Sequence, residues 1–239
     1  MDLTEFYNYQ DKARQVTTSD EALAASRHNS HLYDLIIRPW LPGDTGADIY
    51  EAACGPGILL HWLKSRDYVN VTASDFSPVQ VLLAGQTGYS VTLQDSISQL
   101  KGRAPESLDC IIALDFFEHL SKENFLDFIF ESYRTLRKGG RLILRGPNGD
   151  SPVVGRALYN DITHVTTYTS IAATAVLNMI GFKRVQFKDD TLASRTRLRW
   201  ISVPISWVAQ KILRQLLRFA THENIQCLSA SFFICASKE

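Results

Sequence analysis

From residue 47 onward the chain alternates short apolar runs with amphipathic stretches, and this alternation constrains the fold more than any other feature. It is typical of a parallel sheet whose strands are joined by crossover helices. Seven runs have the length and composition of buried strands, namely residues 47–53, 70–75, 90–94, 109–114, 141–145, 182–188 and 228–236. The sequence therefore predicts an α/β fold with a seven-stranded sheet and helices on both faces.

Three helices are predicted around this sheet. Residues 1–44 contain apolar side chains at helical spacing, which indicates an N-terminal helical cap. Ser121 is a suitable N-cap for a helix between the fourth and fifth strands, and we expect that helix to reach the glycine pair 139–140. A further helix is expected over 169–180, with Gly181 at its end.

The length of 239 residues and the 45% hydrophobic content fit one full-sized core, so we expect residues 1–239 to form a single domain. In this interpretation a core over 45–189 follows the helical cap. A basic amphipathic insert over 190–225 then precedes the last strand, within 226–239.

Composition excludes several classes of protein. The 25 basic residues balance the 25 acidic ones, so no overall field attracts nucleic acid. The polar start of the chain does not resemble a signal peptide, and no apolar run is long enough to span a bilayer. The four cysteines form no C-x-x-C pair or metal-like cluster. A reduced, cytoplasmic setting is the expectation.

The first predicted strand ends in a glycine-containing turn, Glu51-Ala-Ala-Cys-Gly-Pro-Gly57, and an apolar helix start follows it. Gly55 and Gly57 allow a ligand to approach the backbone closely, and the helix start supplies unpaired amide donors. Such a strand, turn and helix predicts a nucleotide-like ligand.

Acidic residues end the next two strands at the same edge of the sheet. Ligands of open parallel sheets lie beyond the carboxyl ends of the strands. Asp75 can accept hydrogen bonds from both hydroxyls of a ribose there. Asp95 can accept a hydrogen bond from the exocyclic amine of an adenine. Phe76 can flank the ring.

The turn from Glu51 to Gly57 resembles the first motif of class I methyltransferases that use S-adenosylmethionine (SAM). The resemblance extends over residues 45–189, through Asp75-Phe-Ser-Pro, Asp95-Ser96, the segment 114–119 and the segment 137–141. It implies a Rossmann-like methyltransferase sheet, SAM as cofactor, and transfer of a methyl group from the SAM sulfonium. In that family the first motif cradles the methionine part of SAM, and the second acidic residue holds the ribose.

Carried over onto these motifs, the resemblance predicts a set of cofactor-binding residues. They are Glu51, Ala53, Cys54, Gly55, Pro56, Gly57, Asp75, Phe76, Ser77, Asp95, Ser96, Asp115 and Phe116.

The turn departs from the family at Ala53, where a glycine is usual. We expect the change to be tolerated, because an added methyl is prohibitive only if the backbone must be left-handed. A nicotinamide cofactor is disfavoured, because its fingerprint needs a glycine where Leu60 stands.

The segment after the fourth strand carries an acid, two aromatics, another acid and a histidine. If it is helical, Asp115, Glu118 and His119 share one face. One interpretation is a site for Mg²⁺ or a similar ion, because some quinone-pathway O-methyltransferases have a similar E-x-x-E-H segment. A second makes Glu118 and His119 a hydrogen-bonded pair that anchors the loop. In a third, His119 is the general base that deprotonates the acceptor.

A polar loop over 159–168 supplies a rival base, His164. Asp161 can orient this histidine or bind a sugar hydroxyl. The loop resembles the D-x-T-H segment of methyltransferases that act on bacterial surface glycans. The alternative is that Asp161 and His164 only fix the loop by hydrogen bonds.

The insert before the last strand is a predicted basic amphipathic helix. Residues 195–218 contain six arginines and lysines and no acid, with apolar residues at helical spacing through 219. We expect the apolar stripe to pack on the domain. The alternatives are a lid, a dimer face, or peripheral contact with an anionic membrane, with Trp200 and Trp207 near the headgroups.

Together these features predict SAM-dependent O-methylation of a small molecule, such as a sugar, a lipid-linked glycan or a quinone-like phenol. Two alternatives stay open at this point: methylation of an amine, and a catalytically silent SAM-binding subunit.

Overall fold

A computed structural model describes residues 16–190, 199–222, 225 and 227–239. One sheet dominates it, with the strand order β3-β2-β1-β4-β5-β7-β6. The strands are β1 (Ile49–Ala52), β2 (Val71–Asp75), β3 (Ser90–Leu93), β4 (Leu108–Leu114), β5 (Leu136–Pro147), β6 (Lys183–Asp189) and β7 (Ser231–Ser237). Every predicted strand is present, which confirms the fold class.

The direction of the last strand sets the shape of the sheet. The first five strands pair in parallel, whereas β7 is antiparallel to both of its neighbours, β5 and β6. The carboxyl ends of β1 to β5 therefore meet at one edge, where the glycine-containing turn also lies.

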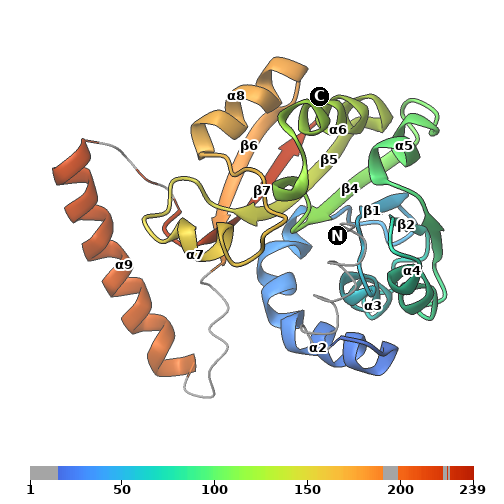
Figure 1. The fold of residues 1–239 in the computed structure, drawn as a ribbon, viewed down its shortest axis with the longest axis horizontal. Helices are drawn as coiled ribbons and strands as arrows, with labels where there is room; N and C mark the ends of the chain where they lie inside the picture. Colours follow the sequence, from blue (N-terminus) through green and yellow to red (C-terminus); the bar gives the residue numbers. More distant parts are fainter. Residues whose placement is uncertain (1–15, 191–198, 223–224, 226) are drawn as a thin grey trace.

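Helices cover both faces of the sheet (Figure 1). Apolar residues of α2 (Ser19–Ile36), η1 (Arg38–Trp40), α3 (Ile58–Lys64) and α4 (Pro78–Gly85) join one core cluster. Those of α5 (Ser96–Lys101), α6 (Lys122–Thr135) and α8 (Ser170–Ile180) join the other. The short elements η2 (Phe117–His119) and α7 (Val154–Leu158) lie in connecting loops.

Helix α6 begins as expected and ends early. The Ser121 side chain caps it by accepting the amide of Asn124. The predicted end at the glycine pair 139–140 is wrong, because the helix stops at Thr135 and Leu136 already pairs with Leu108 of β4. Strand pairing with a buried neighbour thus overrides the helical pattern. By contrast, α8 ends at Gly181 as predicted, with φ at 121°.

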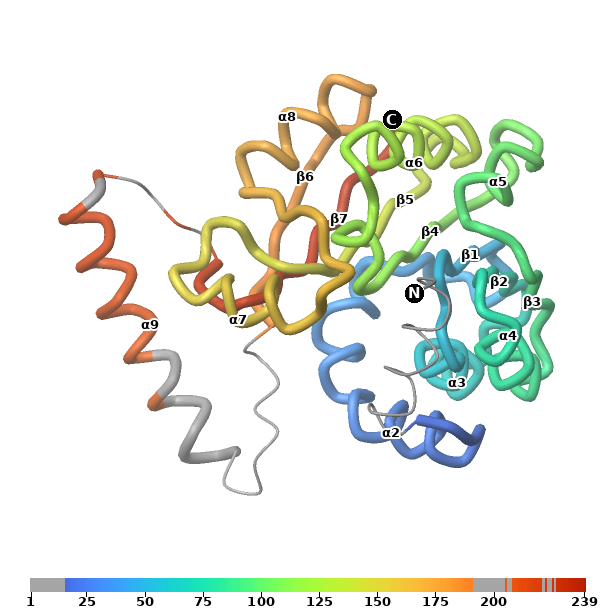
Figure 2. The backbone as a smooth tube through the Cα atoms, viewed as in Figure 1, coloured from blue at the N-terminus to red at the C-terminus, as the bar shows by residue number. Residues whose placement is uncertain are grey.

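The predicted basic helix is present as α9 (Arg199–Thr221), and it stands apart from the sheet (Figure 2). The expectation that its apolar stripe packs on the domain is wrong, because Ile205, Ile212 and Leu216 are exposed. Some predicted features lie outside the part that the structure describes: Arg195, Arg197, and the side chains of Arg199, Trp200 and Trp207.

Candidate functional site

The turn after β1 is held in place by the carboxylate that ends β2. One oxygen of Asp75 accepts the amide of Gly55 at 2.9 Å, and the other accepts the amide of Ser77 at 2.9 Å. Asp75 is buried. A buried carboxylate needs such donors. Asp75 therefore shapes the turn at the carboxyl edge.

A second clamp holds the start of the turn. The Ala53 amide donates to Ser96 Oγ at 3.0 Å, and Ser96 Oγ lies 3.2 Å from Ser74 Oγ. Ser74 in turn lies 2.6 Å from the hydroxyl of Tyr50. Sequence reasoning missed Ser74 and Tyr50, because they sit inside strands and belong to no motif. The predicted cofactor residue Ser96 is thus also a support for the turn.

Glu51 is the buried acid of this site. Its side-chain atom Oε2 has no hydrogen-bond partner among the residues that the structure describes, although Glu51 is only 4% exposed. Burial, together with the nearby charge of Asp75, raises the pKa of Glu51 well above its ordinary value. A buried acceptor without a partner is costly unless a ligand supplies the donor.

The geometry of the turn fits an adenosyl cofactor. A Cβ added at Gly55 would meet nothing within 4 Å, so the backbone there borders open space. Glu51 offers a hydrogen-bond acceptor to a cationic donor. The amino group of a methionine moiety would be such a donor. Asp75 offers carboxylate oxygens one strand away. These residues therefore suit the SAM site that the sequence predicts.

Other predicted cofactor residues have identifiable local roles. Asp95 is exposed and caps α5 by accepting the Ser98 amide, and Ser77 caps α4. Cys54 is buried, and its burial raises the pKa of the thiol. Phe76 is 45% exposed beside the carboxyl edge.

Two of the predicted cofactor-binding residues, Asp115 and Phe116, contact other side chains of the protein. Asp115 forms an ion pair with Arg145, whose guanidinium also binds Asp190 at 2.6 Å. Phe116 packs edge-on against Phe128, with ring centroids 5.1 Å apart. The sequence did not reveal the partner of Asp115, because Arg145 lies on the next strand over.

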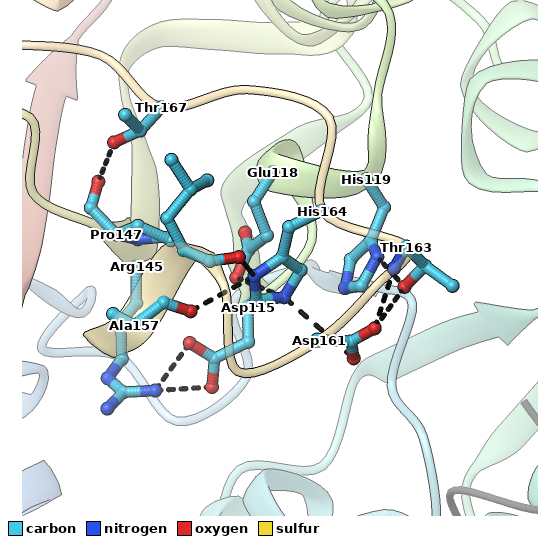
Figure 3. Close-up of polar contacts among 11 residues, drawn as sticks. Asp115, Glu118, His119, Arg145, Pro147, Ala157, Asp161, Thr163, His164 and Thr167 are labelled. Carbon is cyan, nitrogen blue, oxygen red and sulfur yellow. Dashed lines mark hydrogen bonds and ion pairs between the residues drawn. The ribbon is translucent and has the colours of Figure 1, made fainter. Parts of the chain in front are cut away.

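A second polar cluster lies beyond β4, where η2 meets the loop 159–168 (Figure 3). The amide of Val165 donates to the Glu118 carbonyl at 2.7 Å, which ties the loop to η2. Glu118, His119, Asp161 and His164 therefore come together from segments more than forty residues apart.

Within this cluster Asp161 orients one histidine through a threonine. The Thr163 hydroxyl donates to Asp161 Oδ1 at 2.6 Å and lies 2.9 Å from His119 Nδ1. The Asp161 carboxylate is buried, and the Thr163 amide also donates to it. Thr163 is a functional candidate that sequence reasoning passed over as the middle of the D-x-T-H segment.

His164 is oriented by the backbone. Its Nδ1 lies 3.1 Å from the carbonyl oxygen of Ala157 and 3.0 Å from that of Leu158. Its Nε2 lies 4.0 Å from the Glu118 carboxylate and 3.9 Å from that of Asp161. Glu118 is 2% exposed, its Oε2 has no hydrogen-bond partner within the described part of the chain, and burial raises the pKa of this carboxyl.

The structure corrects the predicted metal ligands. Asp115 is not on one helical face with Glu118 and His119, because η2 starts only at Phe117 and Asp115 has φ at 53°. Its carboxylate is bound to Arg145 instead. In the part of the chain that the structure describes, a group with ligand atoms within 4.8 Å of one another is Glu118, His119 and His164.

Ala53 has a left-handed backbone, with φ at 50°. An L-residue in that conformation costs about 1–2 kcal/mol. The backbone at Ala53 is therefore left-handed, contrary to the premise on which we expected the change to be tolerated, and alanine is accommodated there at a cost in stability. Gly57 has φ at 84°, and a Cβ there would lie 3.0 Å from the Ala84 Cα, so alanine would be strained in its place and would press on the backbone of α4.

We expect Ala53→Gly to raise the free energy of unfolding by about 1 kcal/mol, because relief of the left-handed strain exceeds the entropy that glycine adds to the unfolded chain. Denaturant titration measures this change. Gly57→Ala is the matched opposite and should destabilise the protein. An unchanged or lowered stability of Ala53→Gly would contradict the strain at Ala53.

Comparisons with known proteins agree with this geometry. Residues 50–144 match the methyltransferase domain family. A search among curated proteins gave no significant match.

Several solved structures share the fold. A SAM-dependent methyltransferase from Archaeoglobus fulgidus has a TM-score of 0.70 at 18% identity, covering 98% of this chain and 99% of that one. A SAM-dependent methyltransferase from Thermotoga maritima, described as a possible histamine N-methyltransferase, has a TM-score of 0.61 at 14% identity, covering 95% and 97%.

A third similar structure contains the cofactor. Phosphoethanolamine N-methyltransferase 2 from Haemonchus contortus, in complex with SAM, has a TM-score of 0.64 at 15% identity. The match covers 98% of this chain and 60% of that one. Residues 50–144 thus match the methyltransferase domain family, and the whole described chain has the fold of SAM-dependent methyltransferases of known structure.

Proposed function

We propose that this chain is a SAM-dependent methyltransferase that methylates a hydroxyl group of a small molecule or sugar, and that His119 removes the proton of that hydroxyl. The observation that carries this proposal is the hydrogen-bonded series Asp161, Thr163 and His119. A hydroxyl is a weak nucleophile until it is deprotonated, whereas a neutral amine is a good nucleophile without the help of a base.

The hydrogen bonds set the tautomer of His119. An ionised Asp161 only accepts, so the single proton of the Thr163 hydroxyl points to it. Thr163 Oγ1 must then accept from His119 Nδ1, which places the proton on Nδ1 and the lone pair on Nε2. The imidazole is thereby prepared to receive a proton at Nε2, in the way that a buried acid orients a general base.

His164 and Glu118 complete the acceptor side of the proposed site. Both Nδ1 contacts of His164 are carbonyl oxygens, which accept only, so Nδ1 carries a proton and the neutral imidazole has its lone pair on Nε2. His164 and His119 pack edge to face with centroids 4.7 Å apart. We propose that His164 orients the acceptor, and that the buried carboxylate of Glu118 forms a hydrogen bond with the acceptor.

On the cofactor side, SAM supplies an electrophilic methyl group on its sulfonium. The residues that we propose for its binding are Glu51 and the turn 53–57, Asp75-Phe76-Ser77, Asp95-Ser96 and Asp115-Phe116. The main task of these residues is to hold the methyl donor in line with the acceptor oxygen.

A metal-assisted version of the same reaction has one specific observation in its favour. The ligand atoms of Glu118, His119 and His164 lie close enough to share one ion. Two imidazoles and one carboxylate suit Zn²⁺ or Mn²⁺ better than the predicted Mg²⁺, which prefers oxygen ligands. In this version His119 would be a metal ligand rather than a base, and a bound ion would supply the charge that lowers the pKa of the acceptor hydroxyl.

The pKa of Glu51 predicts how cofactor affinity depends on pH. A cationic ligand favours the ionised carboxylate, so binding releases a proton wherever the unbound protein holds Glu51 protonated. We expect SAM affinity to rise with pH and to level off above the raised pKa of Glu51. Calorimetry in buffers of different ionisation enthalpy measures the released proton, and Glu51→Gln should abolish that release.

Histidine variants test the role of the second cluster. With labelled SAM and a panel of sugars and phenols, His119→Gln should lower turnover by about 10²–10⁴-fold, the usual share of a general base. SAM affinity should stay unchanged. His31→Gln, at an exposed position on α2, is the matched control. Full activity of the double variant His119→Gln, His164→Gln would instead favour methylation of an amine.

Chelation separates the base from the metal-assisted reaction. If His119 is the base, EDTA treatment should leave turnover unchanged, and the protein should hold no stoichiometric metal. Loss of activity with EDTA and recovery with Zn²⁺ or Mn²⁺ would favour the ion. SAM binding without turnover on any acceptor of the panel would favour the silent SAM-binding subunit.

A further inference from the structure

Helix α9 presents an apolar stripe to solvent. Five large side chains recur at steps of three and four residues and therefore share one face of the helix. All five are exposed: Ile205 (63%), Val208 (49%), Ile212 (57%), Leu216 (61%) and Phe219 (86%). Exposed apolar side chains that form a continuous stripe mark a contact surface rather than ordinary surface variation.

The opposite side of α9 faces the protein. The Arg214 guanidinium donates to the Ile225 carbonyl at 3.2 Å and lies 3.5 Å from the Asp189 carboxylate at the end of β6. Gln210 and Leu217, on the same side by spacing, are half-buried. The helix is thus attached through its polar side, and among the described elements no helix or strand packs extensively on its apolar stripe.

Charge indicates what covers the stripe. Six of the chain's 25 basic residues lie within 195–218, together with none of its 25 acidic ones. The segment has a formal charge of +6 and the rest of the chain −6. Lys211 and Arg218 are exposed, seven residues apart, and flank the stripe next to Val208 and Phe219. Two copies of such a helix would repel each other, whereas an anionic surface would attract it.

We propose that α9 docks on the surface of an anionic phospholipid bilayer. The helix lies in the plane of the interface, with the stripe in the boundary between headgroups and acyl chains. Lys211 and Arg218 reach from the flank to the lipid phosphates, since long basic side chains extend past apolar surface. Among the described residues no helix is long and apolar enough to cross a membrane, which matches an interfacial position.

The test uses the full chain and vesicles of two compositions. We expect the protein to float with vesicles of equal parts phosphatidylglycerol and phosphatidylcholine, and not with vesicles of phosphatidylcholine alone. Added salt should weaken the binding. Lys211→Gln with Arg218→Gln should lower the partition coefficient by about 30-fold, given the usual contribution of each basic residue near an anionic surface.

A variant pair separates the stripe from general surface hydrophobicity. Ile212→Asp with Leu216→Asp should abolish flotation, whereas Ile171→Asp with Met179→Asp, at 72% and 71% exposed positions of α8, should leave it intact. Unchanged thermal stability and SAM affinity show that each variant folds. Equal flotation of both pairs, or no binding to phosphatidylglycerol, would overturn the proposal. So would a dimer that the α9 pair converts to a monomer without any vesicle binding.

Discussion

The carboxyl edge of the sheet depends on the two hydrogen bonds that the carboxylate of Asp75 accepts. Its two oxygens hold the amides of Gly55 and Ser77, and so connect the turn after β1 to the end of β2. Hydrogen bonds to an ionised acceptor are among the stronger polar contacts in a protein, and here they are buried. The turn is therefore shaped before any ligand arrives. The same charge acts on Glu51, whose pKa it helps to raise.

Two buried carboxylates at the carboxyl edge each have an oxygen that finds no hydrogen-bond partner in the described ranges of the chain. Glu51 lies at the end of β1, and Glu118 lies in η2 after β4. Such groups cost stability, and proteins retain them where a ligand or reaction uses them. One lies beside the glycine-containing turn and the other beside two histidines. In the function that we propose, Glu51 belongs to the cofactor site and Glu118 to the acceptor site, since methyl transfer needs two molecules bound next to each other.

Local patterns were sufficient for the framework of the fold. The alternation of apolar runs predicted all seven strands. The turn from Glu51 to Gly57 marked the carboxyl edge of the sheet, where we propose that the cofactor binds. The predicted caps at Ser121 and Gly181 are also confirmed, because capping depends on residues within one turn of the helix end. The end of α6 at Thr135 did not follow from its own sequence, because the pairing of Leu136 with β4 decides it.

By itself the sequence determined which residue types gather at the carboxyl edge, because strand ends and motifs are local. Only the tertiary structure decided their partners. It pairs Asp115 with Arg145, brings His164 to Glu118, and leaves the stripe of α9 exposed. Each of these contacts joins, or fails to join, segments that are distant in the chain. Their distances depend on how whole elements pack, which no short pattern encodes.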